Sequence, residues 1–172
     1  MSFDIELASM IDHTLLKPDA QGIMIDQLCD EAVQFGFKSV CVHPIWIAHA
    51  KKRIDRQGPL VATVIGFPLG ANLPHLKVAE TQMALEEGAD EIDMVLQISK
   101  LKAGDHFAVK EEIAQVMEAA KRRVVKVIFE NGLLSMEEKI AACRIAEDAG
   151  AHFVKTATGF GPSAQLKKMF PL

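Results

Sequence analysis

The chain has 172 residues, of which 49% are hydrophobic and 24% are charged, and its net charge at pH 7 is −4. This length suits one domain with its own hydrophobic core, and the balanced composition excludes an intrinsically disordered chain. The acidic balance argues against a nucleic-acid partner, and the sequence holds no apolar run long enough to cross a bilayer, so we expect no membrane partner either.

Apolar, β-branched runs alternate with helical patterns along the whole chain. The expected strands are residues 11–14, 40–42, 60–65, 92–96, 124–129 and 153–156. The expected helices are residues 22–35, 74–87, 105–121 and 135–148. The last helix begins with Ser135 and Glu138, which have the spacing of a capping box. The side chains expected to form buried stripes are Leu76, Ala79, Met83 and Ala84 in the second helix and Phe107, Ile113, Val116 and Met117 in the third.

Continuous apolar strands that alternate with helices indicate an α/β fold, with a parallel sheet covered by helices. Two architectures fit this order, namely an open doubly wound sheet and part of a (β/α)8 TIM barrel. The Gly-x-Gly-x-x-Gly turn of a dinucleotide-binding sheet is absent. A full barrel has about 250 residues. The pattern therefore predicts about six of the eight strand–helix units of a barrel, in a single, incomplete domain over residues 1–172.

Three ionisable residues interrupt the apolar strands. They are Asp93, Lys126 and Lys155, and they fall on three successive expected strands. Such side chains are rarely buried without partners, so their positions indicate one shared polar cluster. In a parallel barrel, polar residues near the carboxyl ends of the strands line the active site. The alternatives are a structural salt bridge, or a lysine that reaches solvent from an edge strand.

A lysine held beside a second ammonium in a dry pocket can attack a carbonyl and form a Schiff base. A nearby carboxylate such as Asp93 can move protons to and from the intermediates. The protonated Schiff base itself accepts the electrons of the broken carbon–carbon bond, so no cofactor is needed. The cluster therefore favours class I aldolase chemistry.

Other motifs point less clearly to a function. The six histidines show no metal-binding spacing, and Cys29, Cys41 and Cys143 lack the close spacing of a disulfide or zinc site. We therefore expect no metal and reduced cysteines in the cytoplasm. The run Thr158–Gly161 would let backbone N–H groups approach a phosphate, but it also suits an ordinary tight turn. The acidic pair Glu111–Glu112 is interpreted as a solvated helix end.

Taken in order, several segments resemble the deoxyribose-phosphate aldolase family over about residues 8–162. These segments are Ile11–Pro18, Ser39–Val42, Val64–Gly70, Gly88–Val95, Lys126–Ile128 and Phe153–Phe160. The resemblance implies a (β/α)8 barrel that cleaves 2-deoxy-D-ribose 5-phosphate to glyceraldehyde 3-phosphate and acetaldehyde. It implies that Lys155 forms the Schiff base, that Asp93 donates and accepts protons, and that Lys126 supports them.

The resemblance also implies a substrate pocket. Its expected residues are Asp12, Cys41, Thr158 and Gly159. The expected partners are a small sugar phosphate and an aldehyde, and a homo-oligomer is a further expectation.

The family pattern ends after Gly161 and Pro162, so we expect its last two strand–helix units, with a second catalytic lysine, to be missing. Lys167 and Lys168 do not stand in the context of that lysine, and Glu130-Asn131 replaces the Glu-Thr usual in the family. A six-stranded arc would expose two sheet edges. The alternative function is therefore a truncated, inactive remnant that associates through those open edges.

Overall fold

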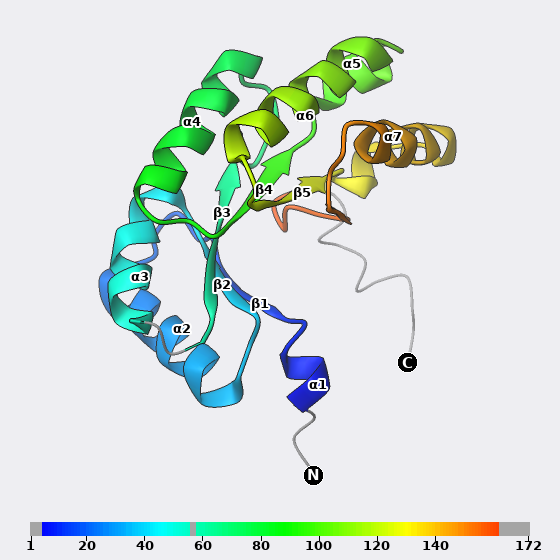
Figure 1. Cartoon of the computed structure of the whole chain (residues 1–172). Coiled ribbons are helices and arrows are strands. Elements are labelled where there is room, and N and C mark those ends of the chain that lie inside the picture. The colour runs from blue at the N-terminus through cyan, green and yellow to red at the C-terminus, as the bar shows by residue number, and fades with distance from the viewer. Residues whose placement is uncertain (1–4, 56–57, 162–172) are drawn as a thin grey trace, which may run out of the picture. The chain divides into compact units, whose positions relative to one another are not determined.

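The computed structural model describes residues 5–55 and 58–161, in which strands and helices alternate along the chain (Figure 1). The sheet follows the order β1-β2-β3-β4-β5-β6. Its strands are β1 (Asp12–Leu15), β2 (Ser39–Val42), β3 (Leu60–Ile65), β4 (Glu91–Val95), β5 (Val124–Ile128) and β6 (Phe153–Lys155). The helices are α1 (Ile5–Ala8), α2 (Gly22–Phe35), α3 (Ile47–Ile54), α4 (Pro74–Glu86), α5 (Ile98–Lys102), α6 (His106–Ala120) and α7 (Met136–Asp148), with 3-10 turns η1 (Pro44–Trp46) and η2 (Asn131–Leu133).

All six predicted strands and all four predicted helices are present, and each of their ends is identical to the prediction or differs from it by one residue. The prediction of an α/β fold is therefore confirmed. Helices α1, α3 and α5 were not predicted, because they have only 4, 8 and 5 residues, too few for a helical pattern to stand out in the sequence. No helix in residues 5–55 and 58–161 has the length and apolar character needed to span a membrane.

The chain divides into two compact units. The first comprises Met1–Val64 and Met83–Ile92. In it, β1, β2 and β3 pair in parallel, with Asp12 opposite Ser39 and Cys41 opposite Ala62. Helices α2 and α3 lie side by side in this unit (Figure 1).

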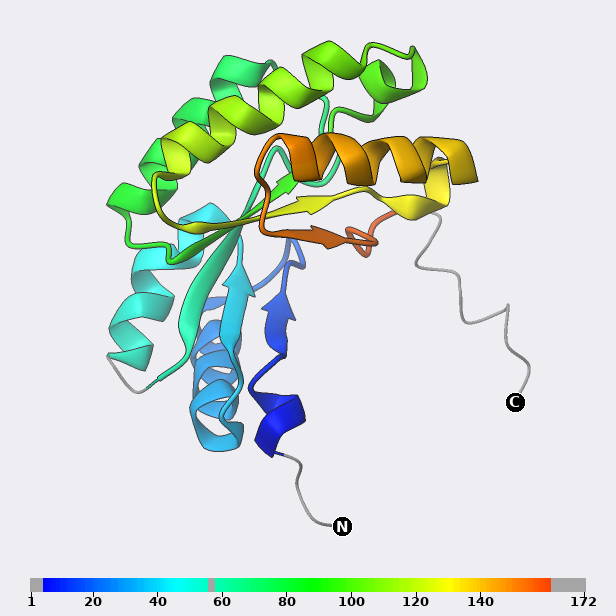
Figure 2. The same ribbon diagram turned by 45° about the vertical axis from the view of Figure 1, so that its right-hand side comes forward.

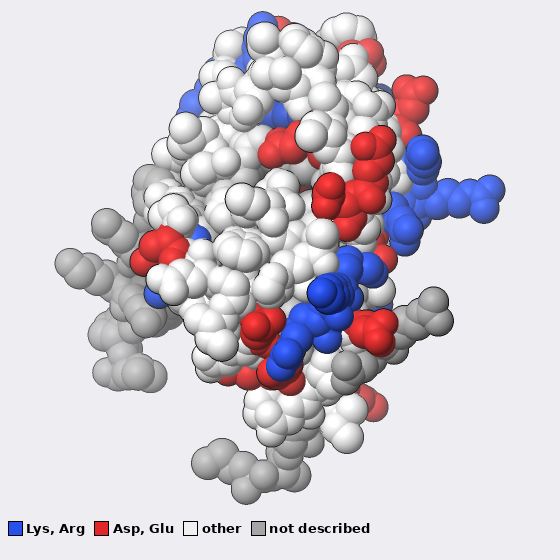
Figure 3. Space-filling model, turned by 90° about the vertical axis from the view of Figure 1, so that its left-hand side faces the viewer, with Lys and Arg blue, Asp and Glu red and all other residues white. Residues whose placement is uncertain are grey.

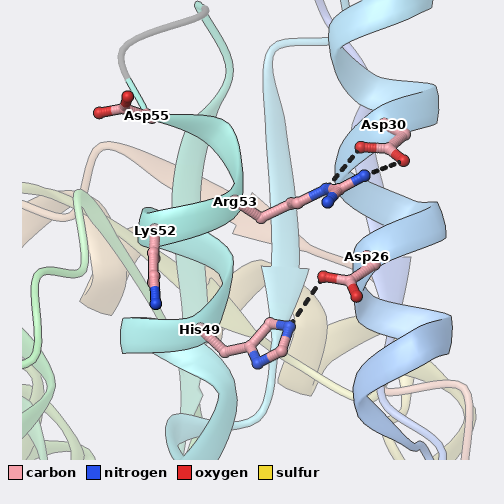
Figure 4. Close-up of a pocket in the computed structure, with 6 residues that line it drawn as sticks. All are labelled: Asp26, Asp30, His49, Lys52, Arg53 and Asp55. Carbon is pink, nitrogen blue, oxygen red and sulfur yellow. Dashed lines mark hydrogen bonds and ion pairs between the residues drawn. The ribbon is translucent and has the colours of Figure 1, made fainter.

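Charged side chains link α2 and α3 at the surface of the first unit (Figure 4). Arg53 donates from Nε and Nη2 to the two carboxylate oxygens of Asp30, over 2.7 and 2.6 Å. Nε2 of His49 lies 2.9 Å from Oδ1 of Asp26. Figure 3 shows acidic and basic side chains close together toward the right and lower part of that view, with uncharged surface over much of the rest. Exposed pairs of this kind stabilise a fold only weakly, and we assign no chemistry to them.

The second unit comprises Ile65–Gln82 and Asp93–Leu172. Strands β5 and β6 pair in parallel and place Lys126 opposite Phe153 and Ile128 opposite Lys155. Helices α6 and α7 lie side by side (Figure 2). The predicted capping box of α7 is confirmed, because Ser135 Oγ accepts from the Glu138 N–H while the Glu138 carboxylate accepts from the Ser135 N–H.

The predicted buried faces of two helices are partly wrong. In α4, Leu76, Ala79 and Met83 are exposed, and only Ala84 of the predicted stripe is buried. The buried positions of this helix are instead Lys77, Thr81 and Ala84. In α6, Ile113 and Val116 are buried as predicted, Met117 is half-buried and Phe107 is exposed.

The interpretation of Glu112 as part of a solvated helix end is also wrong. Glu112 is 1% exposed and Lys77 is 0% exposed. The Lys77 ammonium lies 2.8 Å from the Glu112 carboxylate. This ion pair joins α4 to α6 inside the second unit, and it explains why both charges can be buried.

Candidate active site

Lys155 and Asp93 form an ion pair in the second unit. Asp93 lies in β4, and its side chain is fully buried, whereas Lys155 ends β6 and keeps 28% of its side chain exposed. The Lys155 Nζ donates to the Asp93 Oδ2 over 2.6 Å. The lysine amine is thus held by a buried acid, while the Lys155 side chain as a whole stays partly exposed.

Lys126 approaches the same carboxylate from β5. Its Nζ lies 3.5 Å from the Asp93 Oδ1, and 9% of its side chain is exposed. The predicted proximity of Asp93, Lys126 and Lys155 is therefore confirmed. Their chemical roles remain predictions.

The charges in this cluster suit chemistry at an amine. Two ammonium groups face one carboxylate, so the cluster carries one excess positive charge when all three groups are ionised. A second cation favours loss of a proton from the first. A carboxylate within hydrogen-bond reach of an amine can take that proton and return it. The Lys155 side chain is the more exposed of the two lysines, at 28% against 9% for Lys126.

The loop after β6 is anchored by a buried acid. Glu130 is 2% exposed, and it is the second residue after the end of β5. Its Oε2 accepts hydrogen bonds from the backbone N–H of Thr158, over 3.1 Å, and from the Thr158 hydroxyl. The Phe160 N–H in turn donates to the Thr158 Oγ1 over 3.0 Å. These bonds fix the predicted substrate loop relative to β5.

Two glycines allow the backbone conformation of this loop. Gly159 has a φ of 84°, a conformation that favours glycine. A Cβ at Gly161 would collide with the Glu130 carboxylate. Phe160 packs edge-to-face on Phe67, with the ring centroids 5.5 Å apart. The loop is therefore shaped by close packing as well as by hydrogen bonds.

Comparison with known proteins identifies the family. Residues 7–169 match the description "DeoC/LacD family aldolase". The chain belongs to this family. It is 51% identical over 156 residues to the deoxyribose-phosphate aldolase of Streptococcus pneumoniae serotype 19F (strain G54). This alignment covers 91% of this chain and 71% of that relative. It is also 51% identical over 161 residues to the deoxyribose-phosphate aldolase of Thermoanaerobacter sp. (strain X514), covering 92% and 72%.

Solved structures of aldolases have the same fold as this DeoC/LacD-family chain. The tetrameric deoxyribose phosphate aldolase of Aeropyrum pernix superposes with a TM-score of 0.84 at 35% identity, over 91% of this chain and 66% of that one. The aldolase QR15 gives a TM-score of 0.88 at 36% identity, over 92% and 71%. These matches confirm the predicted TIM-barrel-family fold and the predicted aldolase function. They do not favour the alternative of an inactive remnant.

Two predicted substrate residues of this DeoC/LacD-family chain lie in the first unit. Asp12, in β1, accepts a hydrogen bond from the Ser39 hydroxyl over 2.7 Å. Cys41, in β2, is fully buried. Their predicted closeness to the substrate stays a prediction. Among the described residues, no group of three or more His, Cys, Asp or Glu side chains could hold a metal ion.

Three residues near this site were missed as functional candidates. Lys77 and Glu112 are separated widely in the chain and look like ordinary charges of amphipathic helices. Glu130 was noted only as part of a departure from the family pattern, although its φ of 42° marks a constrained position. The sequence does hold one signal for the burial of Lys77. Lys77 lies on the same helical face as Thr81 and Ala84, of which Ala84 was predicted to be buried.

Proposed function

We propose that this chain catalyses the reversible cleavage of 2-deoxy-D-ribose 5-phosphate to D-glyceraldehyde 3-phosphate and acetaldehyde through a Schiff base on Lys155. The observation that supports it is the Asp93 carboxylate between the ammonium groups of Lys155 and Lys126, at 2.6 and 3.5 Å. The substrate follows from the relatives that are named deoxyribose-phosphate aldolases.

The first step is formation of the iminium. The neutral amine of Lys155 attacks C1 of the open-chain sugar and forms a carbinolamine. Asp93 takes the proton lost by the amine and gives it to the departing hydroxyl, which leaves as water. Lys126 contributes a second ammonium group beside the same carboxylate.

The second step breaks the bond between C2 and C3. A base removes the proton of the C3 hydroxyl, C3 becomes the aldehyde of glyceraldehyde 3-phosphate, and the bonding electrons pass through C2 to the iminium nitrogen. The resulting enamine takes a proton at C2, and water then hydrolyses the new iminium to acetaldehyde and free Lys155. No electrons are gained or lost overall, so Asp93 and water suffice for the proton transfers.

The loop after β6 is proposed to bind the sugar phosphate. Thr158 and Gly159 follow the strand that ends with Lys155, and Glu130 anchors the loop. A glycine with a positive φ lets backbone N–H groups approach an anion closely. Asp12 and Cys41 of the first unit are proposed, on the family resemblance alone, to contact the substrate.

We also propose that the chain works as a homo-oligomer in the cytoplasm. The aldolase of Aeropyrum pernix is described as tetrameric. Light scattering coupled to size exclusion would measure the mass in solution, and a monomer at micromolar concentration would contradict the oligomer.

Trapping with borohydride tests the Schiff base. The protein is incubated with acetaldehyde or with 2-deoxy-D-ribose 5-phosphate, reduced, digested and analysed by mass spectrometry. We expect an ethyl group on Lys155 after incubation with acetaldehyde, and none when borohydride is added first. An unlabelled Lys155 in the folded protein would overturn the proposal. Lys110, an exposed lysine of α6, serves as the internal control for non-specific labelling.

A further inference from the structure

The buried pair of Lys77 and Glu112 lies at the carboxyl end of β4. Lys77 Nζ donates to the backbone oxygen of Val95 over 2.9 Å, and it lies 2.8 Å from Glu112 Oε1. Val95 is the last residue of β4, two positions after Asp93. The pair therefore contacts the strand that carries the proposed proton donor.

Glycines make room for this contact. The Lys77 side chain packs against Gly66. A Cβ at position 66 would lie 2.7 Å from the Lys77 Cε, which is too close. The backbone N–H of Gly66 donates to the Glu80 carboxylate over 2.8 Å, which ties the residue after β3 to α4. A Cβ at Gly70 would collide with the backbone oxygen of Leu96. The end of β4 is thus enclosed by Lys77 on α4 and by the turn that contains Gly66 and Gly70.

Burial makes this arrangement costly. It lowers the pKa of Lys77 and raises the pKa of Glu112, although each partner's charge offsets part of the effect. An apolar pair of the same volume often stabilises a core as well as an ion pair does. The charges therefore need an explanation other than stability, and the hydrogen bond to the Val95 oxygen supplies one.

We infer that Lys77 and Glu112 are positioning residues that hold the end of β4, and through it Asp93, in place against Lys155. This inference rests on the proposed function. Asp93 and Val95 are two residues apart on the same strand, so a backbone displacement at Val95 moves a point of the chain only about 7 Å from the Asp93 Cα. Misplacement of a reacting group by 1 Å can slow a reaction by about a hundredfold.

The test separates position from stability by removing both charges together. Lys77→Met combined with Glu112→Leu leaves no unpaired buried charge, and we expect it to unfold cooperatively near the wild-type temperature. Its kcat should fall by about tenfold or more, with KM within about twofold of the wild type. The matched control is Lys110→Met with Asp148→Leu, an exposed pair that also includes a residue of α6. Wild-type kcat in a folded Lys77/Glu112 double variant would overturn the inference.

Two further measurements cover the other outcomes. If the double variant does not fold, Glu112→Gln carries the test. It keeps the volume and one acceptor oxygen but removes the charge that holds the Lys77 ammonium. We expect a threefold or greater loss of kcat, as an order-of-magnitude estimate, and unchanged kcat would overturn the inference.

Hydrogen exchange distinguishes failure of this inference from failure of the proposed function. The Leu96 N–H donates to the Ile128 oxygen over 3.0 Å at the end of β4. It should exchange faster in the double variant than in the exposed-pair control, whether or not borohydride labels Lys155. Unchanged exchange together with unchanged kcat would show that the pair does not hold the strand end. An unlabelled Lys155 with faster exchange would contradict only the aldolase mechanism.

Discussion

The ammonium of Lys155 lies 2.6 Å from a carboxylate, that of Asp93, which is completely buried. The acid comes from β4 and the amine from β6, while β5 contributes Lys126 to the same carboxylate at 3.5 Å. Each of the three charged side chains is thus held by a residue of a different β-strand. Functional groups on strands are held more precisely than groups on loops, and this suits an acid that has to exchange protons with a covalent intermediate.

Asp93→Asn should slow the reaction without preventing substrate binding. Asparagine keeps the size of the side chain but cannot accept a proton, so kcat should fall by about 10²–10⁴, with KM little changed. Because the two lysine ammonium groups then lose their shared carboxylate, the thermal midpoint should also fall. Steady-state kinetics and calorimetry would measure both effects, with the exposed Asp148→Asn as control. A kcat equal to that of the wild type would remove Asp93 from the mechanism.

Glu130→Ala should loosen the loop that holds Thr158. The substitution leaves the Thr158 N–H and hydroxyl without their buried acceptor. A lost acceptor of this kind costs about 1–3 kcal/mol. We expect a higher KM for 2-deoxy-D-ribose 5-phosphate and little change for 2-deoxy-D-ribose, which has no phosphate to bind. Glu130→Gln retains one acceptor oxygen and should show a smaller effect. Equal changes for both sugars would contradict phosphate binding by this loop.

Much of the fold is predictable from local patterns. The strands are continuous apolar runs, so their ends are predictable to within one residue. The capping box of Ser135 and Glu138 marks the start of α7. The cluster around Asp93 is predictable for a related reason, since a charge inside an apolar strand needs a partner, and parallel neighbours bring such partners together.

The remaining features depend on contacts between distant segments. Helical spacing alone does not tell whether the face of α4 that contains Leu76 or the face that contains Lys77 is buried. The decision comes from Glu112 on α6, which offers Lys77 a buried partner. Likewise, nothing local to Glu130 shows that its carboxylate will turn inward to meet Thr158. Long-range ion pairs can override local amphipathic patterns, and here they do so next to the proposed site.

Removal of the α7 cap should destabilise the protein modestly. In Ser135→Ala the Glu138 N–H loses its side-chain acceptor. Loss of an N-cap serine costs about 1 kcal/mol, which for a chain of this size is about 2–4 °C in thermal midpoint. Ser135→Asp restores an acceptor and should recover the loss. A Ser135→Ala midpoint equal to that of the wild type would show that water replaces the cap at no cost.

The same cap should contribute to acid sensitivity. Hydrogen bonding to the Ser135 N–H, followed by the contact with Lys102, holds the pKa of Glu138 below its ordinary value. A carboxyl whose pKa is lower in the folded state stabilises the fold above the ordinary glutamate pKa, and this stabilisation is lost as the pH falls through the folded value. Between about pH 5 and pH 3 the thermal midpoint of Glu138→Gln should therefore fall less steeply than that of the wild type. Identical slopes would contradict the assignment, and Glu111→Gln, at an exposed site of α6, is the matched control.

Cysteine labelling should follow burial and charge. Burial, with a smaller contribution from Asp26, raises the pKa of Cys29 to about 11. At pH 8 about one Cys29 thiol in a thousand is then ionised, and the thiolate is the reactive form. Cys143 is exposed, whereas Cys29 and Cys41 are buried. Iodoacetamide at pH 8 should therefore modify Cys143 first in the folded protein and all three cysteines at similar rates in denaturant, as mass spectrometry would measure. Because the folded state holds the Cys29 proton more tightly, stability should also decline as the pH rises from 9.0 towards about 11. Rapid labelling of Cys29 in the folded protein would show that α2 and its surroundings open far more often than this packing predicts.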